Sequence, residues 1–131
     1  MEAIERTLDM SLADAEQAVR AALAAEGFGI LTEIDVAATL EAKLGVHRSP
    51  LKILGACNPS LAHQALGIDP ALALLLPCNV VIERTDDGRT RVAIVDPRAL
   101  LTAGDVEGSE LETLGAEAAS ALERAVGRLA Q

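Results

Sequence analysis

Two cysteines offer the clearest chance for chemistry in this sequence, and the first of them is Cys57. It closes a short apolar strand in the segment LGACNPSLAHQAL, directly before Asn58 and Pro59, which are typical residues for a helix start. Unpaired backbone amides and the helix dipole favour an anion at that position. A partly exposed Cys57 thiol would therefore be a better nucleophile or metal ligand than an ordinary one.

The second cysteine, Cys78, lies at the start of a predicted strand in LLPCNVVIE. If the two strands pair antiparallel, Cys57 and Cys78 lie at the same edge of the sheet. His63, on the helix between them, adds an imidazole. Thiolate and imidazole suit zinc, copper or iron, so Cys57, His63 and Cys78 predict a three-ligand metal or redox site, although their spacing matches no standard zinc module.

An asparagine follows each cysteine, and the amides of Asn58 and Asn79 are further candidates for ligand binding. A purely structural interpretation stands beside this one. Free cysteine is among the most buried residue types, and His63 fits a solvated helix surface. Helix capping accounts for Asn58, and strand-end hydrogen bonds account for Asn79.

A weaker cluster of cationic side chains surrounds the loop at 45–50, where it could bind a phosphate or a carboxylate: Lys43, His47, Arg48 and Lys52. Solvated loop charges explain the same residues. The sequence contains no P-loop, no G-x-G-x-x-G, no G-x-S-x-G and no H-E-x-x-H motif. These motifs therefore identify neither a cofactor nor an enzyme class, and both stay undetermined.

Length and composition favour one domain over residues 1–131, with a mass of 13.6 kDa. Half of the residues are apolar, but Phe28 is the only aromatic one, so the core must consist of Ala, Leu, Val and Ile. The net charge of -9 repels a phosphate backbone, and no aromatic platform is present for base stacking. A nucleic-acid partner is not expected.

The sequence also predicts a cytoplasmic protein with no membrane partner. Its longest apolar run, 71–78, is far shorter than the roughly 20 residues that span a bilayer. Acidic residues occupy the N-terminus, where a secretory signal needs a basic start and an apolar stretch. Two cysteines are too few for a disulfide framework, although the sequence does not exclude a single disulfide between them.

Hydrophobic periodicity and turn residues predict the elements that position these side chains. The predicted strands span 3–10, 28–36, 52–57, 79–84 and 89–95, and the predicted helices span 12–26, 37–44, 60–66, 71–75, 97–101 and 109–130. A tight turn at 85–88 joins the last two strands as a hairpin. This order favours an α+β fold with a mixed or antiparallel sheet and helices on one face.

The last predicted helix has a continuous apolar stripe that is meant for packing: Leu111, Leu114, Ala118, Leu122, Val126 and Leu129. The stripe could cover the core of its own chain. It could also form a dimer seam.

Four segments, GFGILTEIDVAATLEAKLG, LGACNPSLAHQAL, LLPCNVVIE and VAIVDP, closely resemble the domain-of-unknown-function 302 family over about residues 10–103. The resemblance constrains the first strand and the C-terminal helix, about 109–130, less than the rest of the chain. The resemblance implies a two-layer α+β sandwich with a mostly antiparallel sheet, a topology related to half of the TATA-binding protein, and a homodimer. It implies no activity. Family members often carry an aromatic residue where this chain has Ser49, Pro50 and Leu51, so a pocket shaped by that ring is expected to differ here.

Three functions follow as hypotheses. The first is a small homodimeric domain that binds a small molecule or metal ion near Cys57 and Cys78. The second is a thiol-dependent enzyme or redox protein with Cys57 as the nucleophile and His63 as a group that activates it. The third is a structural dimerisation or partner-binding module that uses the Leu111 to Leu129 stripe.

Overall fold

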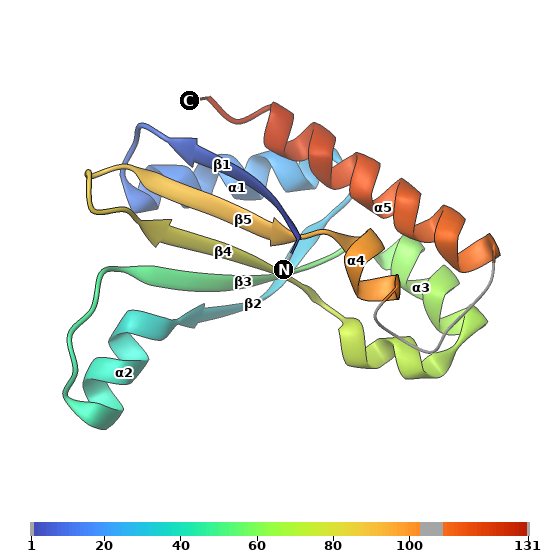
Figure 1. Ribbon diagram of the computed structural model, residues 1–131, viewed down its shortest axis with the longest axis horizontal. Coiled ribbons are helices and arrows are strands. Elements are labelled where there is room, and N and C mark those ends of the chain that lie inside the picture. The colour runs from blue at the N-terminus through green and yellow to red at the C-terminus, as the bar shows by residue number, and fades with distance from the viewer. Residues whose placement is uncertain (1, 103–108, 131) are drawn as a thin grey trace.

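One antiparallel sheet of five strands, in the order β1-β5-β4-β3-β2, organises the protein (Figure 1). The computed structural model describes residues 2–102 and 109–130. The strands are β1 (Ala3–Leu8), β2 (Gly29–Asp35), β3 (Leu51–Cys57), β4 (Cys78–Arg84) and β5 (Thr90–Val95). All four neighbouring pairs are antiparallel, which confirms the α+β class and makes the sheet fully antiparallel.

Two long helices form the second layer of the sandwich. The helices are α1 (Leu12–Ala25), α2 (Val36–Leu44), α3 (Pro59–Ile68), the 3-10 helix η1 (Pro70–Leu75), α4 (Pro97–Thr102) and α5 (Ser109–Gly127). Figure 1 shows α1 and α5 side by side over one face of the sheet, whereas α2 and η1 lie on the other side, at opposite ends. The expected collection of all helices on one face is thus only partly met.

In the described part of the chain, no helix combines the length and the apolar character that a membrane crossing needs.

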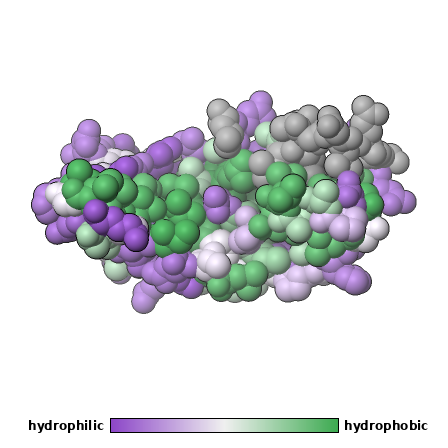
Figure 2. Space-filling view, turned by 90° about the horizontal axis from the view of Figure 1, so that it is seen from below, coloured by the Kyte–Doolittle hydropathy of each residue, from purple (hydrophilic) through white to green (hydrophobic). Residues whose placement is uncertain are grey.

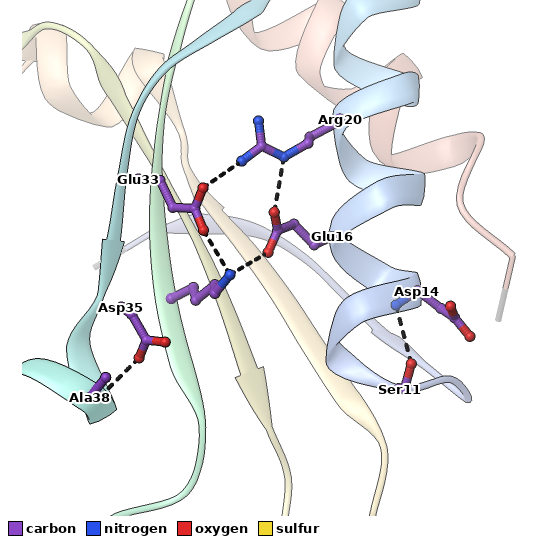
Figure 3. Close-up of polar contacts among 8 residues, drawn as sticks. Ser11, Asp14, Glu16, Arg20, Glu33, Asp35 and Ala38 are labelled. Carbon is purple, nitrogen blue, oxygen red and sulfur yellow. Dashed lines mark hydrogen bonds and ion pairs between the residues drawn. The ribbon is translucent and has the colours of Figure 1, made fainter. Parts of the chain in front are cut away.

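Local side-chain hydrogen bonds begin these helices where the sequence predicts. Ser11 Oγ accepts a hydrogen bond from the Asp14 amide at 3.1 Å, and Asp35 Oδ1 accepts one from the Ala38 amide at 2.9 Å (Figure 3). Each bond satisfies an amide that has no partner within its helix. At the other end of α2, Gly45 has a φ of 67°, a left-handed conformation that favours glycine.

The apolar stripe of α5 is largely buried within its own chain, and its second half completes the core on the sheet. Leu122 is fully buried, and Leu111, Leu114, Val126 and Leu129 are each 7 % exposed or less. Fully buried strand residues such as Leu54 and Ile82 form the opposite side of this core. The stripe is therefore not available as a surface for a partner, and the interpretation of α5 as a dimer seam is wrong.

A polar network connects α1 to the sheet edge formed by β2 and β3 (Figure 3). Lys52 Nζ donates to Glu16 Oε1 at 3.0 Å and to Glu33 Oε1 at 2.7 Å, and Arg20 bonds the same two carboxylates at 3.0 Å each. Burial raises the pKa of Glu16, but the hydrogen bonds from Lys52 and Arg20 outweigh it, and the net pKa is lowered. The network therefore links α1 to this edge of the sheet through two positive and two negative groups.

Candidate functional site

The fold brings the two cysteines to the same end of the sheet, as predicted. Cys57 is the last residue of β3 and Cys78 is the first residue of β4. These strands pair antiparallel with Ala56 opposite Cys78, so Cys57 and Cys78 are offset by one residue at the same end of this strand pair. Both cysteines are free and both are partly exposed.

A cavity of about 80 Å³ opens where both thiols meet the surrounding helices. Its walls come from the ends of β3 and β4 and from α3, η1 and α5. Apolar side chains dominate the lining: Phe28, Ala56, Leu61, Ala62, Ala65, Leu72, Leu75, Leu76, Pro97, Leu111, Leu114 and Ala118, with Gly115, Cys57, Cys78 and Asn58. Among the described lining residues none is charged, so the site favours uncharged, apolar groups.

The Cys78 thiol is held in its neutral form. Burial raises the pKa of Cys78, and a negative charge on the neighbouring Cys57 would raise it further. The thiolate is the reactive form of cysteine, so a thiol with a raised pKa is a weak nucleophile at neutral pH. Within this pair, Cys57 stays the candidate for reactivity.

Asn58 uses its side chain for structure. Its Oδ1 accepts a hydrogen bond from the Leu61 amide at 3.2 Å and thereby caps α3, while its Nδ2 donates to the Glu26 carbonyl at 3.4 Å. The amide thus links α3 to the end of α1 and is already satisfied on both sides. Asn79 is exposed and lies along a different groove, beside Val81 and Val95. The structure therefore separates the two asparagines.

His63 lies apart from the cysteines. It is exposed on α3 and does not line the cavity. Within residues 2–102 and 109–130, no three His, Cys, Asp or Glu side chains are grouped so that they could hold a metal ion. The predicted three-ligand arrangement of Cys57, His63 and Cys78 is thus not formed, because one turn of helix directs the imidazole to solvent.

The cationic residues near the 45–50 loop do not converge on an anion site. Lys52 belongs to the network with Glu16 and Glu33, and Arg48 forms an ion pair with Glu83. His47 Nδ1 lies 3.7 Å from Glu41 Oε1 on the exposed end of α2. Arg48 and Lys52 are therefore already paired with carboxylates of this chain, which a phosphate would have to displace.

Sequence reasoning missed the far wall of the cavity. Leu111, Leu114 and Ala118 of α5 face Cys57 across the pocket, although more than fifty residues separate them along the chain. The amphipathic stripe predicted that these residues pack against something. Only the path of the chain decides that they close this site.

Comparisons with known proteins agree with this fold. The model of one family, described as "Domain of unknown function DUF302", matches residues 4–129, a span that includes most of β1 and all of α5. The crystal structure of an uncharacterized conserved DUF302 protein from Bacillus stearothermophilus is similar with a TM-score of 0.89 and 24 % identity, over 98 % of each chain. At this identity the likeness extends to the fold alone. No curated protein matches the chain.

Proposed function

The chain belongs to the DUF302 family, and from this premise, which carries no activity, we propose that it is a binding domain for a small, uncharged, apolar molecule. The cavity beside Cys57 and Cys78 is the proposed binding site. The observation that supports the proposal is the lining itself: among the described lining residues, Asn58 and the two thiols are the only polar side chains, and Asn58 is already hydrogen-bonded.

The lining restricts the chemistry of the ligand. A charged ligand would lose its hydration in this cavity and find no opposite charge among the described lining residues. An apolar ligand would gain about 25 cal/mol for each Å² of apolar surface that leaves water. The proposed ligand is therefore a neutral molecule with a mainly hydrocarbon surface.

The volume restricts its size. A cavity of about 150 Å³ lined by aliphatic side chains is known to bind benzene. The volume here is about 80 Å³, so the ligand is either a molecule no larger than benzene or the end of a longer apolar chain. Both belong to the same class of neutral, apolar ligand.

The two thiols are the groups of this site that offer a ligand a polar contact. A neutral S–H group is a weak hydrogen-bond donor and a polarizable contact for a π-system or a carbonyl oxygen. The raised pKa of Cys78 preserves that neutral form. We infer that Cys57 and Cys78 orient the ligand while the aliphatic walls provide the affinity.

Nucleophilic catalysis at Cys57 receives less support from the same residues. A catalytic thiol needs a neighbouring base or cation that activates it. No imidazole, carboxylate or amine is present among the described residues that line the cavity, and His63 is exposed outside it. Binding without catalysis is therefore the function that the geometry favours.

Benzene, with benzoate as its charged counterpart, tests the proposal. Benzene is expected to raise the melting temperature in proportion to the logarithm of its concentration above its Kd and to slow the alkylation of Cys57 and Cys78 by iodoacetamide. Benzoate is expected to do neither. Constant melting and alkylation with benzene would contradict the proposal.

A pair of α5 variants localises the effect. Ala118→Leu adds three heavy atoms at the cavity wall and is expected to abolish the response to benzene. Ala116→Leu adds the same group at an exposed position two residues away and is expected to leave the response unchanged. Far-ultraviolet circular dichroism of both variants verifies folding. An unchanged response in folded Ala118→Leu would place benzene elsewhere.

A further inference from the structure

A groove adjoins the cavity at the point where η1 leads into β4. It has a volume of about 540 Å³, is here named the Asn79 groove, and is lined by Ala3, Leu74, Leu75, Leu76, Pro77, Cys78, Asn79, Val81, Ala93 and Val95. Three of these residues, Leu75, Leu76 and Cys78, also line the cavity. The same short segment therefore forms a wall of both hollows.

The floor of the Asn79 groove belongs to the face of the sheet opposite α1 and α5. The buried residues of β4 and β5 face the helices, so Val81, Ala93 and Val95, which alternate with them, point away. Val81 lies opposite Ala93, and Val95 lies opposite Ala3. These four side chains form one apolar floor across β4, β5 and β1.

The wall of the groove is apolar as well. Leu74 of η1 contributes to it with 88 % of its surface exposed. Figure 2 views the molecule from this side and shows hydrophobic surface around η1 and again over α2 and the adjoining sheet. A ligand in the groove would thus remove apolar surface from water on its floor and on its wall.

Charged side chains of this face lie farther along the same strands and are paired with one another. Arg91 Nη2 lies 3.0 Å from Glu83 Oε1, and Arg91 Nη1 lies 3.6 Å from Glu5 Oε2. Among the described residues that line the Asn79 groove, none is charged. The groove therefore favours an uncharged ligand, as the cavity does.

Asn79 provides the groove with a polar group that is available to a ligand. The residue is exposed and lies opposite Gly55 of β3, which has no side chain to offer it. Within the described part of the chain its carboxamide has no hydrogen-bond partner, in contrast to that of Asn58. A free carboxamide both donates and accepts, so it suits a hydroxyl, amide or carbonyl group.

We propose that the Asn79 groove extends the binding site and that the ligand is an uncharged single-chain amphiphile, such as a long-chain alcohol or amide. The proposal rests on the function proposed above. The apolar end of the chain occupies the cavity, which holds no more than about the six carbon atoms of benzene. The chain then passes over the shared wall at 75–78 into the groove, where Asn79 binds the polar group.

A series of alcohols tests the extension by chain length. Isothermal titration calorimetry of the full chain measures the Kd of butan-1-ol, hexan-1-ol, octan-1-ol and decan-1-ol. Each methylene that leaves water favours binding by about 0.8 kcal/mol, which is about fourfold in Kd. Because the groove is open on one side, we expect the Kd to fall at least about tenfold in total from hexan-1-ol to decan-1-ol. A Kd that no longer falls beyond hexan-1-ol would overturn the proposal.

A matched pair of variants localises the chain. Ala93→Lys places a long charged side chain on the groove floor, opposite Glu5, and this opposite charge on the neighbouring strand supports folding. It is expected to abolish the gain of decan-1-ol over hexan-1-ol and to leave benzene binding unchanged. Ala21→Lys, at an exposed position of α1, is expected to change neither. If Ala93→Lys is folded by circular dichroism and keeps the gain, the chain does not lie in the groove.

Asn79→Ala tests the polar contact. Loss of one hydrogen bond is expected to weaken decan-1-ol binding about fivefold while benzene binding stays the same. An unchanged Kd for decan-1-ol would remove Asn79 from the site and contradict the proposed position of the polar group.

Benzene separates a failure of this inference from a failure of the proposed function. Binding of benzene without a gain beyond hexan-1-ol would refute the extension and leave the cavity as the binding site. A groove that is covered by another protein chain would give this same negative result. Absence of both responses would refute the binding site itself.

Discussion

The two faces of one sheet differ more in what covers them than in their residues. On the helix-covered face, Leu54, Val80, Ile82 and Val92 have no exposed surface at all. On the opposite face, named the open face, Val81 of β4 is only half-buried although it is equally apolar. Residue type therefore predicts a tendency to be buried, and the positions of α1 and α5 decide which of the two apolar faces is buried within one chain.

The largest expected effect comes from equal truncations on the two faces. Ile82→Ala removes three buried carbon atoms from the closed core and is expected to lower the free energy of unfolding by about 3 kcal/mol. Ile53→Ala removes the same atoms from the open face and is expected to cost about 1 kcal/mol or less in the monomer, since water already reaches this side chain. Urea denaturation at low protein concentration measures both. Equal losses of unfolding free energy would mean that Ile53 is packed as tightly in solution as Ile82.

At Gly55 the open face is closely packed by β2 and by the segment before β4. A Cβ at this position would overlap Thr32 Oγ1 and lie 2.8 Å from Pro77 Cγ. Gly55→Ala is therefore expected to cost about 2 kcal/mol in the same denaturation experiment, because the Thr32 side chain and the Pro77 ring must move.

Gly67 serves as the control for that substitution. No atom lies within 4 Å of the Cβ that alanine would add there, and the residue lies within α3. Gly67→Ala is expected to stabilise the protein by about 0.5 to 1 kcal/mol through helix propensity. A neutral Gly55→Ala would show that the close approach of Thr32 and Pro77 is relaxed in solution.

On the covered side, Arg6 attaches the end of α5 to the sheet. Its Nη1 donates to the carbonyl of Val126 at 3.1 Å and to that of Leu129 at 2.6 Å, where a helix terminus favours a cation. Arg6→Met keeps most of the side-chain volume but removes these bonds, and it is expected to cost about 1.5 kcal/mol. Arg89→Met, which breaks an exposed pair with Asp87, is expected to change the stability by less than about 0.5 kcal/mol. Similar losses in the two variants would argue against a role for Arg6 in holding α5.

The smallest effect concerns the polar network at the edge of the covered face. The pKa of Glu16 is lowered in the folded protein, so its contribution is fully present above its unfolded pKa of about 4.3 and is lost as the pH falls through the lower folded value. Hydrogen bonds from Lys52 to Glu33 and Glu16 raise the pKa of Lys52, so its contribution is present below about pH 10 and is lost as the pH rises through the higher folded value.

Glu16→Gln measures this contribution directly. The variant is expected to be about 1 kcal/mol less stable than the wild type at pH 7, with the difference shrinking below about pH 4. Urea denaturation at both pH values provides the comparison. A difference that is independent of pH would assign the loss to packing of the side chain rather than to its charge.

The candidate site could be predicted from the sequence only in part. Strand ends at Cys57 and Cys78 follow from local patterns, and the antiparallel pairing of β3 and β4 brings both to one edge as expected. The sequence also predicts the imidazole of His63 at this edge, but His63 lies on the exposed side of α3, away from the two cysteines. The sequence of this ten-residue helix does not set its rotation about its own axis. Contacts with η1 and α5 select one rotation, and that rotation decides which side chains face the cavity.

The sequence by itself determined the elements, because capping bonds, glycine turns and apolar periodicity act between residues only a few positions apart. Ser11, Asp35 and Asn58 begin their helices through such bonds. The tertiary structure decided which surfaces close. It sealed the α5 stripe against the sheet, placed Leu114 beside the two thiols and left Val81 half-buried. Contacts between residues far apart in the chain set these outcomes, and no local pattern records which of two apolar surfaces a distant helix will cover.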